Sequence, residues 1–547
     1  MAKEYRLKDI SSLDLDAGAK QEVEVEGIEN AKVLLVNTGG KVQALGSKCT
    51  HYGAPLVKGV LTRSGRLTCP WHGACFNAKT GDVEDAPALD SLPVFALSER
   101  NGAVYIKGSE SAIKSSRRKP SLSCNAVAAQ DKVVVIGGGS GALGLVEGLR
   151  EKGYSGAITM VSNEGYLPID RTKLSKALMT DASKLAWRDK AWFDSASIEF
   201  VQAEATGVDF SARSIATKEG QSISYTKLVL ATGGTARRLP LPGFKDLGNI
   251  FTLRNVHDAS AIVSAIGDKG KKIVIIGSSF IGMEAANATC SDNSVVVVDM
   301  AKTPLERVLG SQIGQGIRHL YESKGVKFHM SAAIDRAEPS ASDASKVGAV
   351  VLKDGTRLEA HVVILGIGVS PATQFLRDNK ALSLEPDGSI RTDQTFQVQG
   401  LDHVYAIGDI ATHPYHGPGG DGKPTRIEHW NVAQNAGRSA AAHIASPNPS
   451  PASPLRQPMP IFWSALGAQL RYCGNPTNGW DDLVLHGNPA DAKFVAYYAL
   501  GEIVVAMASM GMDPAMVQSA ELMRTGKMPS KSQLSNGLDI MHVGVPE

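Results

Sequence analysis

Residues 132–150 read KVVVIGGGSGALGLVEGLR, and this stretch decides the fold of much of the chain. A short apolar run ends at a glycine-rich turn, and small and apolar residues then recur with helical spacing. Residues 272–290, KIVIIGSSFIGMEAANATC, repeat the pattern, and further apolar runs follow at 158–164 (ITMVSNE) and 295–300 (VVVVDM). Two such strand–turn–helix–strand units, some 140 residues apart, predict two α/β domains that each bind a dinucleotide.

The first glycine-rich turn has the spacing Gly137-x-Gly139-x-x-Ala142. Gly137 permits a tight turn, and Gly139 lets the backbone approach a pyrophosphate. Ala142 replaces a third glycine but is small enough for the helix to pack on the strand. A lone pattern of this kind is weak, because many glycine-rich turns are only turns. Here a strand precedes it, a helix follows it, and Glu164 ends the next strand, where an acid would bind a ribose hydroxyl.

The second turn reads Gly277-x-Ser279-x-x-Gly282, with serine in place of the middle glycine. Asp299 ends the following strand, 22 residues after Gly277. An acid there accepts hydrogen bonds from the adenosine ribose and repels a 2′-phosphate, so NAD(H) is favoured over NADP(H). Lys302 lies close by in the sequence and makes this preference a moderate one. One site would then hold a permanently bound flavin dinucleotide, and the other would bind a nicotinamide dinucleotide reversibly.

Residues 49–73, CTHYGAPLVKGVLTRSGRLTCPWHG, contain two cysteines and two histidines in a matched arrangement. Cys49-x-His51 is followed, after seventeen residues, by Cys69-x-x-His72. The candidates are a zinc knuckle, a chance arrangement and an electron-transfer centre. Zinc sites favour CxxC pairs, whereas two thiolates on one iron and two imidazoles on the other define a Rieske [2Fe–2S] centre. We therefore predict that these four residues bind such a cluster.

The same segment resembles Rieske proteins but differs from those of the respiratory chain. Those proteins carry one further cysteine in each loop, where this chain has Ala54 and Trp71, and a serine and a tyrosine, where it has Ala74 and Phe76. Without those two hydroxyl donors the reduced cluster is less stabilised, so we expect a potential toward the low end of the Rieske range. Cys75 has no partner in this pattern and is predicted to be a structural thiol.

Composition sets broad limits on the function. A chain of 547 residues with 43% apolar and 20% charged residues is typical of a globular protein with three or four domains. A net charge of +2 argues against nucleic-acid binding. No apolar run is long enough to span a membrane, and the N-terminal residues lack a leader pattern, so we expect a cytoplasmic protein. Six cysteines do not form a disulfide framework, and Cys290 is predicted to be a small buried residue.

Three further motifs resemble the pyridine-nucleotide flavoprotein reductases. LVLATGG contains Ala231, Thr232 and Gly233, at the end of a strand that a cofactor can approach. GIGVSP begins at Gly366, and HVYAIGDIA places Asp409 after a strand and a glycine. With the first glycine-rich turn, these motifs occur in that family's order, and the resemblance covers about residues 130–547. It implies that Asp409 binds the ribityl chain of FAD.

Residues 164–176, EGYLPIDRTKLSK, separate subfamilies of this fold. The disulfide reductases carry a redox cysteine pair near here, and this stretch has none, which excludes dithiol chemistry. It resembles instead a segment of apoptosis-inducing factor and of oxygenase-type ferredoxin reductases. That resemblance implies that Arg171 binds FAD and that Lys176 lies near flavin N5, paired with Glu284. A cation there stabilises a reduced, anionic flavin; the alternative is a lysine on a solvated helix.

The stretch RIEHWNVAQNAGR, from Arg426, also resembles these reductases and implies that Trp430 lies near the flavin. The alternative is a core tryptophan without cofactor contact. Trp463, in MPIFW, fits both interpretations equally. The predicted catalytic residues are Lys176, Glu284 and Trp430.

The expected architecture is multidomain: a small all-β Rieske domain, an α/β reductase with two Rossmann domains, and a C-terminal α+β domain. The predicted boundaries are 1–107 for the Rieske domain, 108–130 for an exposed linker, 131–255 and 381–450 for the FAD domain, 256–380 for the NAD(H) domain and 451–547 for the C-terminal domain.

Nearly the whole chain resembles the Rieske-containing branch of the apoptosis-inducing-factor-like proteins. The resemblance implies an NAD(P)H-dependent oxidoreductase, with NADH preferred, that passes electrons through FAD and a Rieske [2Fe–2S] cluster to an unidentified one-electron acceptor, a protein or a small molecule. Two alternatives remain: a redox-gated signalling protein with slow turnover, and a reductase for a separate oxygenase. We expect a monomer or a homodimer.

Overall fold

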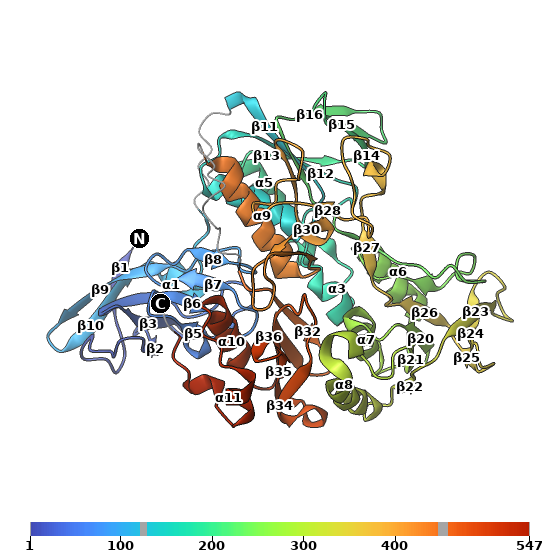
Figure 1. The fold of residues 1–547 in the computed structure, drawn as a ribbon. Helices are drawn as coiled ribbons and strands as arrows, with labels where there is room; N and C mark the ends of the chain where they lie inside the picture. The colour runs from blue at the N-terminus through green and yellow to red at the C-terminus, as the bar shows by residue number, and fades with distance from the viewer. Residues whose placement is uncertain (1, 121–127, 447–457, 546–547) are drawn as a thin grey trace.

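The N-terminal part of the computed structural model is an all-β domain with two sheets (Figure 1). The structure describes residues 2–120, 128–446 and 458–545. The six-stranded sheet has the order β1-β10-β9-β4-β3-β2, and the smaller sheet has the order β5-β6-β7-β8. Both predicted ligand pairs lie in loops after strands, because β4 ends just before Cys49 and the β6–β7 hairpin contains Cys69 and His72. The strands are β1 (Lys3–Arg6), β2 (Lys20–Glu24), β3 (Lys32–Thr38), β4 (Lys41–Gly46), β5 (Val60–Leu61), β6 (Arg66–Thr68), β7 (Cys75–Asn77), β8 (Val83–Asp85), β9 (Val94–Arg100) and β10 (Ala103–Gly108).

The predicted linker at 108–130 differs from the structure at both ends. Helix α1 (Glu110–Ser115) is capped by the Ser109 side chain and buries Ile113 against the β domain. The backbone of Arg118 then pairs with that of Ser91, so the chain stays on the domain surface. Strand β11 already begins at Ala128. The part of the predicted linker at 121–127 lies outside the described residues, as does the predicted boundary at 450/451.

The first α/β domain is a parallel five-stranded sheet with the order β13-β12-β11-β17-β29. Its last strand, β29, lies in the second predicted part of this domain, at 381–450. As expected, the chain returns to this sheet after it has formed the second α/β domain. Helices α2 and α9 pack closely: a Cβ added to Gly144 would lie 2.4 Å from the Gln434 carbonyl oxygen. The elements are β11 (Ala128–Ile136), α2 (Ser140–Glu151), β12 (Gly156–Ser162), α3 (Thr172–Ala177), α4 (Ala182–Leu185), α5 (Lys190–Ser195), β13 (Ile198–Gln202), β14 (Ala205–Asp209), β15 (Ser214–Thr217), β16 (Ser222–Ser224), β17 (Lys227–Leu230), β18 (Gly234–Ala236), β28 (Ile390–Arg391), β29 (Val404–Ala406), β30 (Ala411–Tyr415), β31 (Lys423–Arg426) and α9 (Trp430–Ala445).

The second α/β domain repeats this design with the order β19-β26-β20-β21-β22. Its three central strands are buried on both faces, which explains their continuous runs of valine and isoleucine. The elements are β19 (Ile250–Phe251), α6 (Val256–Ile266), β20 (Lys272–Ile276), α7 (Phe280–Thr289), β21 (Ser294–Val298), α8 (Glu306–Glu322), β22 (Lys327–His329), β23 (Ile334–Pro339), β24 (Val347–Leu352), β25 (Arg357–Glu359), β26 (Val362–Leu365) and β27 (Val369–Pro371).

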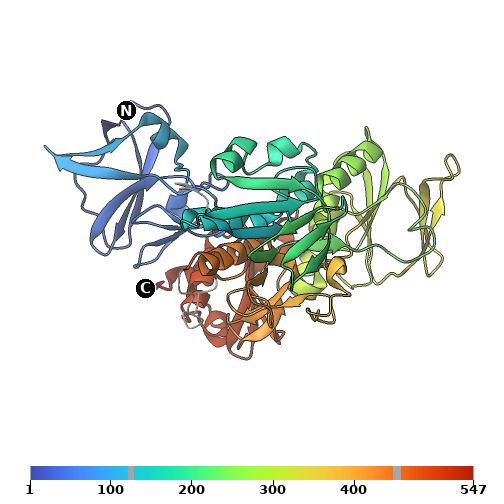
Figure 2. The same cartoon turned by 90° about the horizontal axis from the view of Figure 1, so that it is seen from above.

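The C-terminal domain is an antiparallel five-stranded sheet, in the order β32-β33-β36-β35-β34, with two helices. It lies between the β domain and the second α/β domain (Figure 1), while Figure 2 shows the β domain and the β23–β25 sheet at opposite ends of an elongated molecule. The elements are β32 (Ile461–Ala465), β33 (Gln469–Gly474), β34 (Asp482–Asn488), β35 (Lys493–Leu500), β36 (Ile503–Met510), α10 (Ala515–Arg524) and α11 (Lys531–Ser535).

A buried histidine on β30 predicts acid sensitivity of the fold. His413 packs against Phe396, and burial lowers its pKa to about 4. The unfolded chain takes up the proton near pH 6.5, so the stability supplied by the neutral ring is complete above that pH and is lost toward pH 4. From pH 7.5 to pH 5 this one group should cost about 2 kcal/mol.

We expect His413→Phe to flatten the dependence of the urea midpoint on pH between 7.5 and 5. His542, whose side chain is 84% exposed, provides the matched control: His542→Asn should leave the slope unchanged. Equal slopes for His413→Phe and the unmodified protein would contradict this assignment.

Candidate iron–sulfur and flavin sites

The two loops with the predicted metal ligands have the same backbone turn. In each loop the cysteine amide donates to the carbonyl five residues later, and the glycine four residues after the cysteine donates back to the cysteine carbonyl. Gly53 and Gly73 both have positive φ, +79° and +73°, which favours glycine. The four bonds are Cys49 N to Ala54 O at 2.8 Å, Gly53 N to Cys49 O at 2.8 Å, Cys69 N to Ala74 O at 2.8 Å and Gly73 N to Cys69 O at 3.3 Å.

These turns bring the four side chains together. His51 Nδ1 and His72 Nδ1 lie 3.1 Å apart, and the thiols of Cys49 and Cys69 lie close enough for each to influence the pKa of the other. All four are buried, with 6% or less of each residue exposed. Burial lowers the pKa of His51 to about 3 and that of His72 as well, so both imidazoles are neutral at pH 7, the form that binds metals. Two thiol and two imidazole donors that converge from paired loops fit a mixed-ligand [2Fe–2S] centre.

A cavity of about 540 Å³ lies where the two α/β domains meet the C-terminal domain. The N-terminus of α2 opens onto it, which suits a pyrophosphate. Of the predicted flavin and nucleotide residues, these line the cavity: Gly139, Arg171, Lys176, Ala231, Gly233, Ser279, Glu284, Asp409 and Trp430. Their position beside one cavity fits a flavin dinucleotide.

Several predicted residues contact neighbouring backbone rather than the cavity. A Cβ on Gly137 would lie 2.2 Å from the Ala231 carbonyl oxygen, and one on Gly282 would lie 2.0 Å from that of Gly277. A Cβ on Gly366 would lie 2.8 Å from the Cα atom of Gly282, and Ala142, in the first turn of α2, is fully buried. Small residues are therefore required here for strand–turn–helix packing. Thr232 donates its hydroxyl to the Ala372 carbonyl at 2.8 Å.

Lys176 and Glu284 form an ion pair between α3 and α7, with Nζ 3.0 Å from Oε1. Glu284 is 2% exposed and also accepts hydrogen bonds from the hydroxyls of Ser175 and, at 2.6 Å, Ser464. One carboxylate thus joins the first α/β domain, the second α/β domain and the C-terminal domain. The pair fixes the ammonium group at the cavity wall.

The acids predicted to bind ribose (Glu164 and Asp299) and the ribityl chain (Asp409) are engaged within the protein. Glu164 accepts from Arg171, and Asp409 accepts from Arg254 Nη2 at 3.1 Å. Asp299 accepts from the amide and hydroxyl of Ser278 at 2.6 and 2.7 Å, which orders the loop after β20. Their binding roles stay predictions.

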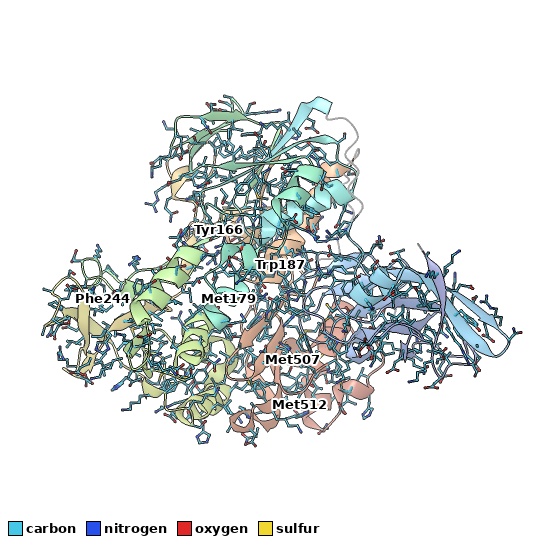
Figure 3. All side chains as sticks on the ribbon, turned by 180° about the vertical axis from the view of Figure 1, so that it is seen from behind. Tyr166, Met179, Trp187, Phe244, Met507 and Met512 are labelled. Atoms are coloured by element: carbon cyan, nitrogen blue, oxygen red, sulfur yellow. The ribbon has the colours of Figure 1, made fainter. Side chains whose placement is uncertain are left out.

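Aromatic side chains connect the metal-ligand loops to the cavity. The rings of Trp463 and His72 lie 4.4 Å apart, and Trp463 and Trp430 both line the cavity. Trp187 stacks on His51 at 5.5 Å and contacts Trp430 at 6.4 Å. Figure 3 shows Trp187 near the junction of the β domain with the rest of the molecule. We did not predict Trp187 from the sequence, where it has no motif around it.

A buried ion network holds the β domain against the first α/β domain. Arg188 Nη1 lies 2.7 Å from Asp90 of the β domain, and its Nε lies 2.6 Å from Glu147 of α2. The hydroxyl of Tyr52, next to the ligand His51, donates to Asp170 in front of α3. In this docked arrangement, Trp187 of the first α/β domain contacts His51, and Trp463 of the C-terminal domain contacts His72.

Family models match the three predicted parts of the chain. Residues 5–96 match "Rieske [2Fe-2S] domain", residues 131–437 match "Pyridine nucleotide-disulphide oxidoreductase" and residues 461–539 match "Reductase C-terminal". The predicted fold class, enzyme class, FAD and [2Fe–2S] cluster are confirmed by these matches. No helix in the described residues combines the length and apolar content needed to cross a membrane.

Individual relatives agree with these matches. The chain is 37% identical to apoptosis-inducing factor 3 of Homo sapiens over 97% of its own length and 85% of the relative's. It is 30% identical to the ferredoxin–NAD(+) reductase component of the anthranilate 1,2-dioxygenase system of Burkholderia cepacia, over 74% of its length and 97% of the relative's. The covalent putidaredoxin reductase–putidaredoxin complex has a TM-score of 0.68 and 26% identity, with 77% of this chain and 100% of that chain covered. The chain therefore belongs to the pyridine nucleotide-disulphide oxidoreductase family, as a Rieske-containing member similar over nearly its whole length to apoptosis-inducing factor 3.

Proposed function

We propose that this protein takes electrons from NADH at its flavin site and delivers them to its own Rieske cluster, from which a one-electron acceptor collects them. A bound flavin accepts two electrons from a nicotinamide and can release them singly, which matches a cluster that carries one. The observation that carries the proposal is the position of Trp463, which lines the cavity and contacts both imidazoles, with ring centroids 5.5 Å from His51 and 4.4 Å from His72.

The residues have distinct roles in this proposal. Cys49, Cys69, His51 and His72 hold the cluster. Arg171 and Asp409 bind the flavin dinucleotide, and the N-terminus of α2 faces its pyrophosphate. Lys176, held by Glu284, supplies a fixed positive charge on the cavity wall where negative charge develops.

The nicotinamide is assigned to the second α/β domain. Gly277, Ser279 and Gly282 form its turn, and the Ser279 side chain caps α7. Asp299 at the end of β21 favours NADH over NADPH, because a 2′-phosphate would meet a carboxylate there. Relatives named as ferredoxin–NAD(+) reductase components support the same donor.

Stopped-flow mixing of the holoprotein with NADH tests the internal step. We expect bleaching of flavin absorbance first, followed by bleaching of the cluster, with first-order kinetics that do not depend on protein concentration, because donor and acceptor are docked in one chain. Electron paramagnetic resonance of the product should show a reduced Rieske centre. Rapid flavin reduction with an unchanged cluster would overturn the proposal and favour a flavin that reduces a separate partner, as in an oxygenase system.

A further inference from the structure

The C-terminal domain places a buried cation beside the metal-ligand loops. Strands β32 and β33 pair so that Arg471 lies directly opposite Trp463, whose ring is 4.4 Å from that of His72. A Cβ added to Gly73 would lie 2.4 Å from Ile461 of β32, so this strand packs directly on the second ligand loop. Arg471 is 4% exposed.

The charge of Arg471 is incompletely paired within the described residues. Its Nε lies 3.5 Å from Asp513 Oδ1, without hydrogen-bond geometry, and its Nη1 donates to Gln469 Oε1 at 3.3 Å. A guanidinium group stays protonated in proteins, and a buried charge without a full partner is costly. Residues directly opposite each other on antiparallel strands project to the same face of the sheet, so the Arg471 side chain lies on the same face as Trp463, which contacts His72.

A [2Fe–2S] centre with two thiolates and two neutral imidazoles has no net charge when both irons are ferric, because two thiolates and two sulfides balance six positive charges. One electron gives it a net charge of −1, and no bond forms or breaks. A fixed cation nearby stabilises that charge. Arg471 thus offsets, from another domain, the loss of hydroxyl donors at Ala74 and Phe76.

We infer that Arg471 raises the reduction potential of the Rieske cluster, so that the C-terminal domain forms part of the cluster site. The inference rests on the proposed cluster ligands. Asp513 opposes the positive charge of Arg471, because its Oδ1 lies 3.5 Å from the Arg471 Nε. Removing Arg471 should make the reduced cluster less stable, and removing the charge of Asp513 should do the opposite.

The test is a mediator-coupled redox titration of the full-length holoprotein, with the electron paramagnetic resonance signal of the reduced cluster as the readout. Arg471→Gln should lower the midpoint so that the one-electron equilibrium shifts at least tenfold, which is about 59 mV. Arg471→Lys should restore most of the shift, and Asp513→Asn should move the midpoint upward. If Arg471 and Asp513 only supported the fold, their substitutions would not be expected to shift the midpoint potential in opposite directions.

An unchanged midpoint in Arg471→Gln, with an unaltered spectrum, would overturn the inference. If Arg471→Gln does not retain a cluster, Asp513→Asn becomes the deciding variant. A midpoint potential equal to or below that of the unmodified protein would then reject the role assigned to Arg471. Because mediators reduce the cluster directly, the titration is independent of NADH and of transfer from the flavin. Failure of the internal electron transfer therefore leaves this result interpretable.

Discussion

Cys69→Ser is expected to abolish delivery of electrons from NADH to cytochrome c while flavin reduction by NADH continues. Cys69 is one of two buried thiols that converge with two imidazoles. Loss of an outer-shell partner alone costs 10–100-fold in metal proteins, so loss of a ligand should cost on the order of 100-fold or more. The measurement is cytochrome c turnover alongside the rate of flavin bleaching, with iron and sulfide analysis of the same samples.

Cys75→Ser is the matched control for this prediction. Cys75 is also fully buried and lies on β7, next to the same loop, but its thiol contacts the side chains of Thr68 and Glu84. Burial raises the pKa of this thiol well above its usual range, as expected for an unreactive structural residue. The control should keep its cluster and its turnover. Full turnover in a cluster-free Cys69→Ser protein would show that the flavin reduces the acceptor directly.

Much of the fold could be predicted because its signals are local. The glycine-rich turns, the apolar strands and the Cys-x-His and Cys-x-x-His pairs each lie within a few residues of sequence. Trp187 carries no such signal, because its importance comes from its contact with His51, which is more than 130 residues away in the chain. Arg471 carries none either, because its position near the second ligand loop depends on the packing of the neighbouring strand β32 against Gly73. Docking between domains is set by complementary surfaces and buried charges, which single-sequence patterns do not reveal.

The linker illustrates the same limit. Ser, Lys and Arg at 109–118 have no hydrophobic period, which predicts an exposed tether. In the structure, Arg117 lies 2.9 Å from the buried Asp90 and donates to the Thr50 carbonyl, one residue from each of two ligands. A charged residue can thus order a segment when it finds a buried counter-ion, which composition alone does not predict.

Lys176→Met is expected to slow flavin reduction by NADH on the order of 100-fold, the usual cost of losing one fixed charge-stabilising group. The substitution also leaves Glu284, 2% exposed, without its cation, which should cost about 3–5 kcal/mol of stability. The rate is measured by stopped-flow flavin absorbance at saturating NADH, and the stability by thermal unfolding of the holoprotein.

Two variants separate the electrostatic role from the structural one. Lys176→Met combined with Glu284→Gln removes the unpaired charge, so it should recover much of the stability but not the rate. Lys173→Met is the matched control, because Lys173 lies one turn earlier on α3, is 38% exposed at its side chain and faces Asp170 and Tyr52. It should reduce its flavin at nearly the normal rate. A double variant that regains both stability and rate would mean that the ammonium group of Lys176 only supports the fold, since the charge itself would then be dispensable at the cavity wall.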